Sequence, residues 1–274
     1  MKILREDNIE QDDSIVSINE LLKDNKKVIS FLGSKQSGVT FLINNIARIM
    51  ARRGIDVAIL DMTSNKDTYY IYTQNKESIR VSIKNNFKDL SEGKLNGLKV
   101  ENNLTVYTDL PSEKEYSVKV ENILETLLKR YQIVLIDTDF STNVDYFTYS
   151  QRVYLVQTMD MLTIQPLTEF LSKLKSQNAI NSEKIRIILN KYINLDGISV
   201  RQLIGGLAFY NDPSMTYMQQ LFEKNGARYT TISYDQHAYE AYLKDIAKYQ
   251  ISIDDNSTEF REELERLTDD VLKE

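Results

Sequence analysis

A strand-like run, a glycine-containing loop and a helical pattern follow one another near the start of the chain. Residues 28–32 are apolar, and apolar residues recur at helical spacing over residues 41–50. Between them, residues 33–40 read GSKQSGVT, which has the spacing of a phosphate-binding P-loop. A P-loop requires this order of strand, loop and helix, so the segment predicts an α/β fold with an anion site after the first strand.

The loop lacks one part of the usual chemistry, because Val39 stands where a P-loop has a lysine. A hydrogen bond to a charged group contributes about 1.5–3 kcal/mol, so we expect nucleotide affinity to be about ten- to a hundredfold lower unless Lys35 or a partner subunit replaces the charge. The alternative is a tight turn that only joins strand to helix. The residues predicted to contact nucleotide are Gly33, Ser34, Lys35, Gln36, Ser37, Gly38, Val39, Thr40 and Phe41.

Strand-like runs recur along the rest of the chain, separated mostly by helical or polar segments. This alternation predicts a doubly wound, mostly parallel sheet of about seven strands flanked by helices. With three prolines and no Pro/Gly-rich linker in 274 residues, one domain over residues 28–274 is expected. The runs span residues 28–32, 56–62, 104–108, 132–137, 153–157, 185–190 and 229–233.

The two ends of the chain have different patterns. The polar segment 1–27 contains a short helical pattern made by Ile15, Ile18, Leu21 and Leu22. Residues 257–274 predict an acidic amphipathic helix, which we expect to dock on protein because its polar face lacks the lysines and arginines of a membrane-seeking helix. Its charged run, 262–266, is expected on the solvated face. The apolar stripe of this helix is Phe260, Leu264, Leu267 and Val271.

Two predicted strands carry an aspartate at the carboxyl end, where open α/β sheets bind ligands. Asp137 is the stronger candidate for a magnesium site opposite the Thr40 hydroxyl, because Mg²⁺ prefers oxygen ligands. Asp61 is a second candidate. The alternative is that either aspartate caps the turn that follows it, which suits Asp61 better than Asp137.

Composition narrows the function classes. The chain has 34 basic and 40 acidic residues, and its formal charge of −6 disfavours DNA and anionic lipid as partners. It has no cysteine, which excludes disulfides and a thiol nucleophile and fits a cytoplasmic protein. His237 is the single histidine, so we expect a surface residue rather than a metal ligand. No apolar run is long enough to span a membrane.

Taken together, these landmarks resemble the MinD/ParA family of deviant P-loop ATPases, from about residue 28 to the C-terminal helix. The resemblance makes Asp137 the Walker B aspartate and Asn190 an adenine-contacting residue. It implies ATP and Mg²⁺ as cofactors, a homodimer, and protein partners within a larger assembly. The matching segments are residues 38–47, 53–61, 160–163, 190–191 and 231–235.

The departures from that family are informative. Ser34 stands at the place of the signature lysine, and Thr63 at the place of the catalytic aspartate, so the resemblance implies weak or absent hydrolysis. Ser233 and Asp139 stand where proline is usual. Loss of the loop lysine resembles the TadZ/CpaE-like branch, which implies positioning or assembly of pilus, secretion or conjugation machinery, with any membrane recruitment through a partner.

Other functions stay open at this point. The first alternative is a scaffold that keeps the fold without binding nucleotide, as Val39 and Thr63 suggest. The second is a DNA-partitioning ATPase, which the acidic composition disfavours. A ligase or synthetase on the same fold is a third, for which the sequence has no substrate motif.

Overall fold

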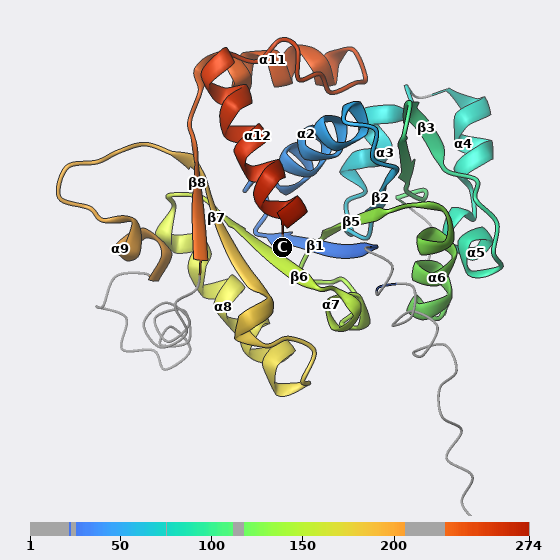
Figure 1. Cartoon of the computed structure of the whole chain (residues 1–274), viewed down its shortest axis with the longest axis horizontal. Helices are drawn as coiled ribbons and strands as arrows, with labels where there is room; N and C mark the ends of the chain where they lie inside the picture. Colours follow the sequence, from blue (N-terminus) through green and yellow to red (C-terminus); the bar gives the residue numbers. More distant parts are fainter. Residues whose placement is uncertain (1–21, 23–25, 75, 112–117, 206–227, 274) are drawn as a thin grey trace, which may run out of the picture.

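The computed structural model describes residues 22, 26–74, 76–111, 118–205 and 228–273. Within these residues one sheet of eight strands has the order β3-β4-β2-β5-β1-β6-β7-β8 (Figure 1). Every neighbouring pair is parallel except β3 and β4. The strands are β1 (Lys27–Gly33), β2 (Val57–Asp61), β3 (Leu98–Glu101), β4 (Leu104–Tyr107), β5 (Ile133–Thr138), β6 (Arg152–Gln157), β7 (Ile185–Tyr192) and β8 (Arg228–Ser233).

The predicted mostly parallel, doubly wound fold is confirmed, and all seven predicted strands are present. The sheet has one strand more than the seven predicted runs, the edge strand β3, which was not predicted. This strand has four partly exposed residues and pairs antiparallel with β4, with a register shift between Lys99 and Glu101. A run this short and half-exposed has too little apolar alternation to be recognised in sequence.

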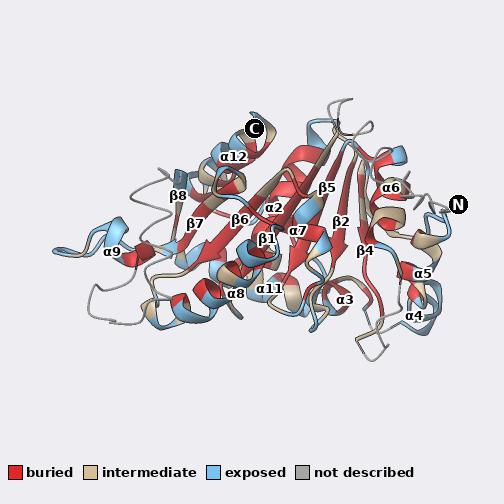
Figure 2. Ribbon diagram, turned by 90° about the horizontal axis from the view of Figure 1, so that it is seen from below, coloured by how far each residue is buried: buried red, intermediate tan, exposed pale blue. Residues whose placement is uncertain are grey.

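Helices cover both faces of the sheet. Figure 2 shows the strands as a buried layer between helices whose outer surfaces are exposed. The helices are α2 (Val39–Arg52), α3 (Asp67–Tyr72), α4 (Glu77–Ile83), α5 (Asn86–Ser91), α6 (Val120–Arg130), α7 (Asp145–Tyr149), α8 (Ile164–Ser176), α9 (Val200–Gly205), α11 (Gln236–Ala247) and α12 (Thr258–Lys273), with the 3-10 turns η1 (Met161–Thr163) and η2 (Ser182–Lys184).

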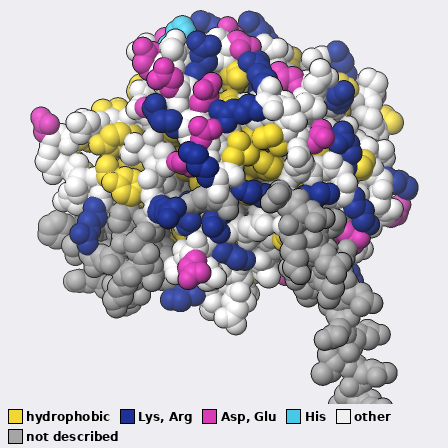
Figure 3. All heavy atoms as spheres, viewed as in Figure 1, with side chains coloured by type: hydrophobic (Ala, Val, Ile, Leu, Met, Phe, Trp, Pro, Cys, Tyr) yellow, Lys and Arg dark blue, Asp and Glu magenta, His cyan; other side chains and the backbone are white. Residues whose placement is uncertain are grey.

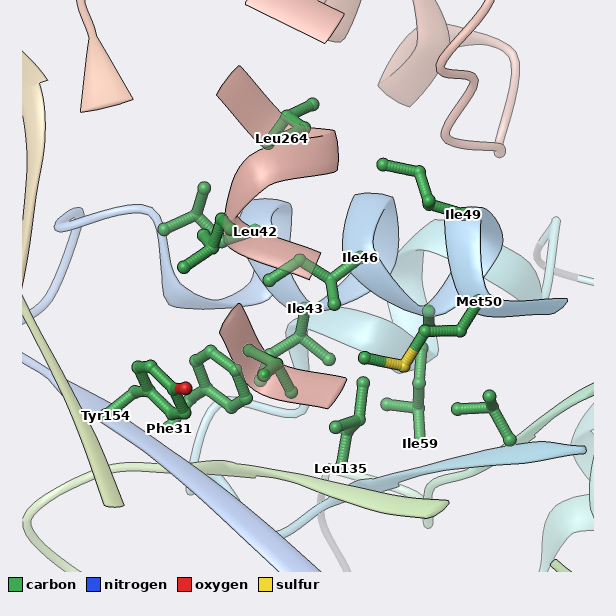
Figure 4. Close-up of a cluster of buried hydrophobic side chains, with 14 of the residues drawn as sticks. Phe31, Leu42, Ile43, Ile46, Ile49, Met50, Ile59, Leu135, Tyr154 and Leu264 are labelled. Atoms are coloured by element: carbon green, nitrogen blue, oxygen red, sulfur yellow. The ribbon is translucent and has the colours of Figure 1, made fainter. Parts of the chain in front are cut away.

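The alternation of side chains along each strand decides which helices it contacts. In β5, Ile133 and Leu135 join the core beneath α2 and α12, whereas Val134 and Ile136 join the core beneath α6. Figure 4 shows the first of these cores, with side chains of α2 lying between the sheet and Leu264 of α12. By the same alternation, the strand-end aspartate of β5 lies on the α2 face of the sheet.

The C-terminal helix α12 docks on this core, as predicted. Its predicted apolar stripe is buried, and the helix packs against α2 and β8. One part of the prediction was wrong: Glu263, expected on a solvated face, is half-buried and accepts hydrogen bonds from the Ser233 N–H and hydroxyl, both at 2.7 Å. This carboxylate fixes the end of β8 to α12.

The N-terminal segment is described only at Leu22 and from residue 26 onward. Leu22 packs against the core beneath α6. The other members of the predicted short helical pattern, Ile15, Ile18 and Leu21, lie outside the described residues. Among the helices that the structure does describe, none has the length and apolarity needed to cross a bilayer.

Candidate nucleotide and magnesium site

The P-loop connects the end of β1 to the start of α2. Its first residues close a turn, in which the Ser37 N–H donates to the Ser34 carbonyl at 3.0 Å. Gln36 has φ 68° and Gly38 has φ 95°, so the loop passes twice through left-handed backbone. Glycine is the residue that adopts this conformation without steric cost, which explains Gly38.

Both loop glycines also lack space for a side chain. A Cβ at Gly33 would lie 2.2 Å from Ser37 Oγ and 2.7 Å from the Val156 carbonyl oxygen. A Cβ at Gly38 would lie 2.4 Å from Asn190 Nδ2. The loop is therefore packed closely between β6 and β7, and its shape depends on both glycines.

A cavity of about 1190 Å³ opens beside the loop, at the carboxyl ends of the parallel strands. Such an edge is where open α/β sheets bind ligands. Most of the predicted site residues line it, whereas Ser37 and Asp61 do not. The predicted residues that line the cavity are Gly33, Ser34, Lys35, Gln36, Gly38, Val39, Thr40, Phe41, Asp137 and Asn190.

Val39 is largely buried, although it also lines the cavity. It is 8% exposed and belongs to the core beneath α2. Lys35 is exposed, and no hydrogen bond or ion pair joins it to any residue that the structure describes. Burial and the charge of Asp61 raise the pKa of Asp67, and the opposing effect of Lys35 places its ammonium group within electrostatic range of that carboxylate.

The predicted metal ligands Thr40 and Asp137 lie together. The Thr40 hydroxyl donates to Asp137 Oδ2 at 2.6 Å. The other oxygen, Oδ1, is buried and has no hydrogen-bond partner among the described residues. Burial and the neighbouring charge of Asp61 raise the pKa of Asp137 well above its usual value. A hard divalent cation fits this pair, because it would compensate the buried charge and occupy the unpartnered oxygen.

Asp61 pairs in register with Asp137 on the neighbouring strand, but its carboxylate is already used. One oxygen accepts from the Thr63 N–H at 3.1 Å and hydroxyl at 2.6 Å, and the other accepts from Thr108 at 3.1 Å. Asp61 therefore caps the turn after β2, which is the alternative role that the sequence predicts for it. Its role as a metal ligand stays a prediction.

Asp139 joins the loops after β2 and β5. One oxygen accepts from the Ser64 N–H and hydroxyl, both at 2.6 Å, and the other accepts from Ser141. Burial alone would raise the pKa of Asp139, but the hydrogen bonds from Ser141 and Ser64 outweigh it and lower the pKa. In the sequence Asp139 stands out only as a departure from proline, and its link to Ser64 was not predicted.

The end of β7 contacts the P-loop directly. The Asn190 side-chain amide donates to the Ser37 carbonyl at 2.8 Å, and the Lys191 ammonium group donates to the Gln36 carbonyl at 3.0 Å. Lys191 was not among the predicted site residues. Its place after Asn190, at the end of a predicted strand, was the signal that would have found it.

An aromatic wall formed by Phe41, Tyr239, Tyr242 and Phe260 lines part of the cavity. Phe41 lies edge-on to Tyr242, with ring centroids 5.2 Å apart, and also contacts Phe260 at 6.1 Å. Tyr239, 47% exposed, lines the same end. Flat apolar surfaces of this kind contact bases or sugars as readily as they contact protein. Only Phe41 among them was predicted as a site residue.

Acidic residues outnumber basic ones around the cavity. Within the described part of the chain, the cations that line it are Lys35 and Lys191, and the carboxylates are Asp67, Asp137, Asp139 and Asp235. His237 is exposed nearby on α11, as predicted, and no cluster of three potential metal-binding side chains of the His, Cys, Asp or Glu type occurs among these described residues. An anionic ligand would therefore enter more favourably together with a divalent cation.

The structure resembles several solved nucleotide-binding proteins, although no protein-family model and no curated protein sequence matches the chain. A plasmid partition protein of Borrelia burgdorferi bound to AMPPNP superimposes with a TM-score of 0.60 and 15% identity, covering 90% of this chain and 99% of that one. A chain of the MinC:MinD cell division protein complex of Aquifex aeolicus superimposes with a TM-score of 0.60 and 14% identity, covering 90% of this chain and 96% of that one.

A third solved structure carries both nucleotide and metal. The septum site-determining protein MinD of Pyrococcus horikoshii, complexed with Mg-ADP, gives a TM-score of 0.57 at 14% identity and covers 90% of this chain and 96% of that chain. Identities this low establish a common fold and nothing finer. The chain has the α/β fold of the MinD/ParA P-loop proteins.

Proposed function

We propose that this chain is a MinD/ParA-like P-loop protein that binds ATP with Mg²⁺ and uses the bound state to dimerise. The dimer would position or recruit a macromolecular assembly, with hydrolysis slow or absent. The observation that carries the proposal is the buried Oδ1 of Asp137, which has no hydrogen-bond partner in the described part of the chain and lies beside the Thr40 hydroxyl in a cavity that a P-loop lines. The fold shared with solved complexes of AMPPNP and Mg-ADP supports the choice of ligand.

Several residues would hold the ligand. Thr40 and Asp137 would hold Mg²⁺, which neutralises phosphate charge when bound. The amide N–H groups of the loop and of the first turn of α2 would contact the phosphates, since the first N–H groups of a helix have no partner within it. The aromatic wall around Phe41 and Tyr242 would take the base or sugar. Asn190 is proposed to lie against the same nucleotide.

Slow or absent hydrolysis follows from the groups near the phosphate end. Thr63 occupies the place where the resemblance expects a catalytic aspartate, and its hydroxyl donates to Asp61 at 2.6 Å. A threonine hydroxyl does not accept a proton from water near neutral pH as a carboxylate does. Val39 adds no positive charge to stabilise the transferred phosphoryl group. The nucleotide would therefore act as a switch ligand rather than as a rapidly consumed substrate.

The switch would work by a population shift. Nucleotide that bridges the P-loop and the loops after β2 and β5 favours the conformation in which those loops are ordered around it. We propose that this conformation favours a homodimer and presents a surface to the protein components of a larger assembly. The missing loop lysine favours the TadZ/CpaE-like branch, and with it pilus, secretion or conjugation machinery, to which the protein would be recruited through a partner.

Two observations favour a second function, that of a nucleotide-free scaffold. Val39 is packed into the core, and four carboxylates line a cavity that has two lysines among the described residues.

A DNA-partitioning role has weaker support. The net charge is −6, and lysine and arginine side chains are interspersed with acidic ones on the face shown in Figure 3. Salt-sensitive binding to nonspecific DNA would instead favour that role.

Calorimetric titration with ATP and Mg²⁺, combined with light scattering, tests the proposal. We expect saturable binding, a shift from monomer to dimer, and loss of both in Gly38→Trp, because this position has left-handed backbone and no room for a side chain. Lys35→Ala is expected to weaken binding. The absence of heat and of any mass change up to millimolar ATP would favour the scaffold.

A further inference from the structure

We infer that Asn190 and Lys191 form a strap that holds the P-loop in its anion-binding shape, and that Lys191 supplies the fixed positive charge that Val39 does not. This inference deepens the proposed function and rests on it for the identity of the ligand. The strap itself consists of contacts within the chain and includes no ligand atom. It makes Lys191 a positioning residue for the loop and a positive charge in the lining of the cavity.

The two contacts of the strap are adjacent and point to successive carbonyls. Asn190 is 4% exposed, and its amide holds the Ser37 carbonyl; the Lys191 ammonium group holds the Gln36 carbonyl. In a trans peptide the carbonyl and the following N–H point in opposite directions. Fixing both carbonyls toward β7 therefore fixes the N–H groups of Ser37 and Gly38 away from it. The Ser37 N–H then closes the turn onto Ser34.

The backbone of β7 is distorted at the strap. Lys191 has φ 57°, which is left-handed backbone for a residue with a side chain, and the register between β7 and β8 shifts between Asn190 and Tyr192. A residue inserted in this way leaves the alternation of the strand and turns its side chain in a new direction. Strained backbone of this kind persists when surrounding contacts require it, and it is frequent at functional sites.

Lys191 and Lys35 differ in how firmly the ammonium group is held. Both line the cavity, but the Lys191 ammonium group is held at 3.0 Å from a loop carbonyl, whereas Lys35 has no hydrogen bond or ion pair to a described residue. A cation that is already in place loses less conformational entropy when an anion binds. Lys191 therefore contributes both loop order and positive charge before any ligand arrives.

The test compares Lys191→Met with Lys191→Arg and with Lys184→Met. Lys184 is a matched control, since it precedes β7, its ammonium group donates to the Thr148 carbonyl at 2.9 Å, and it does not line the cavity. Hydrogen exchange of the amides of residues 34–40 is measured in nucleotide-free protein. We expect about tenfold faster exchange in Lys191→Met, which corresponds to about 1.4 kcal/mol, and parent-like exchange in the other two variants.

Affinity for Mg-ATP is then measured by calorimetry, with thermal unfolding as a check on folding. We expect the Kd to rise about ten- to a hundredfold in Lys191→Met, with Lys191→Arg close to the parent. Parent-like exchange in Lys191→Met overturns the strap, and so does an unchanged Kd when the parent binds. If the parent itself binds no nucleotide, the proposed function fails, and the exchange measurement alone decides the strap.

Discussion

The Thr40 hydroxyl and the Asp137 carboxylate meet at 2.6 Å through one carboxylate oxygen, and the other oxygen stays buried without a hydrogen-bond partner among the described residues. A hydroxyl neutralises little of the charge, because it shares a single hydrogen bond with the carboxylate. The pair thus has the donor atoms of a cation site and a charge that is costly to bury alone. This relationship makes the metal the most directly testable part of the site.

Asp137→Asn is expected to abolish stabilisation by Mg-ATP without unfolding the protein. In the parent, ligand at about 100 times its Kd raises the free energy of unfolding by about 2.7 kcal/mol. The amide keeps the size of the side chain but removes the charge that binds the metal. Thermal unfolding with and without Mg-ATP measures both effects. Asp61→Asn is the contrast, since that carboxylate accepts bonds from Thr63 and Thr108, and it should lower stability even without ligand. Full stabilisation of Asp137→Asn by Mg-ATP would contradict the assignment.

The pH dependence of stability should carry the signature of Asp137. Its pKa is raised in the folded state, so the folded protein binds more protons than the unfolded chain between pH 3.8 and the raised pKa. Its contribution therefore favours folding at low pH and becomes destabilising as the pH rises through that window. Asp139, with a lowered pKa, contributes in the opposite direction: its stabilisation is lost as the pH falls through its folded pKa. Urea unfolding at a series of pH values measures this effect. In Asp137→Asn the free energy of unfolding should fall less steeply at high pH than in the parent. An unchanged pH profile would contradict a raised pKa of Asp137.

Asp139→Ala is expected to release the loops after β2 and β5 from each other. Its carboxylate accepts five hydrogen bonds: four from the N–H and hydroxyl of Ser64 and of Ser141, and a longer one of 3.5 Å from the Thr142 hydroxyl. Because the site is partly exposed to water, we expect a loss of only about 1–2 kcal/mol in stability. Hydrogen exchange over residues 62–66 and 138–142 should increase, whereas exchange in α8 should not. Ser64→Ala removes one of the bonds and should give a smaller increase at the same sites.

Val39→Lys is expected to tighten Mg-ATP binding about ten- to a hundredfold, by restoring a charged donor to the loop. The substitution also removes a buried apolar side chain, at a cost of about 1–2 kcal/mol in stability. Val39→Met is the matched control, because it has similar length without the charge. Calorimetry on all three proteins separates charge from shape. Equal affinities in the two variants would show that the loop does not place this residue near the phosphates.

The sequence predicts those parts of the site that depend on local order or on strand alternation. Strand, loop and helix are contiguous, so Gly33 and Gly38 were identified from spacing alone. Asp137 lies beside Thr40, as the sequence predicts, because residues at the carboxyl ends of parallel strands meet at one edge of the sheet. Lys191 was not predicted as a site residue, because its partner lies 155 residues away in the chain. Glu263 was expected on the solvated face, because its partner lies 30 residues away. Such contacts depend on the packed structure, which a single sequence does not contain.

Ser233→Pro tests whether Ser233 and Glu263 compensate for the absence of the proline that the resemblance expects. Proline is tolerated in an edge strand such as β8, so the backbone alone does not forbid it. It would, however, remove both the N–H and the hydroxyl that donate to Glu263 at 2.7 Å and leave that half-buried carboxylate without them. We expect a loss of about 1–3 kcal/mol and faster hydrogen exchange in α12. Glu263→Ala should cost less when combined with Ser233→Pro than when introduced alone, because the two side chains act as a unit. Strictly additive losses in a double-mutant cycle would mean that α12 is held by its apolar stripe and not by this pair.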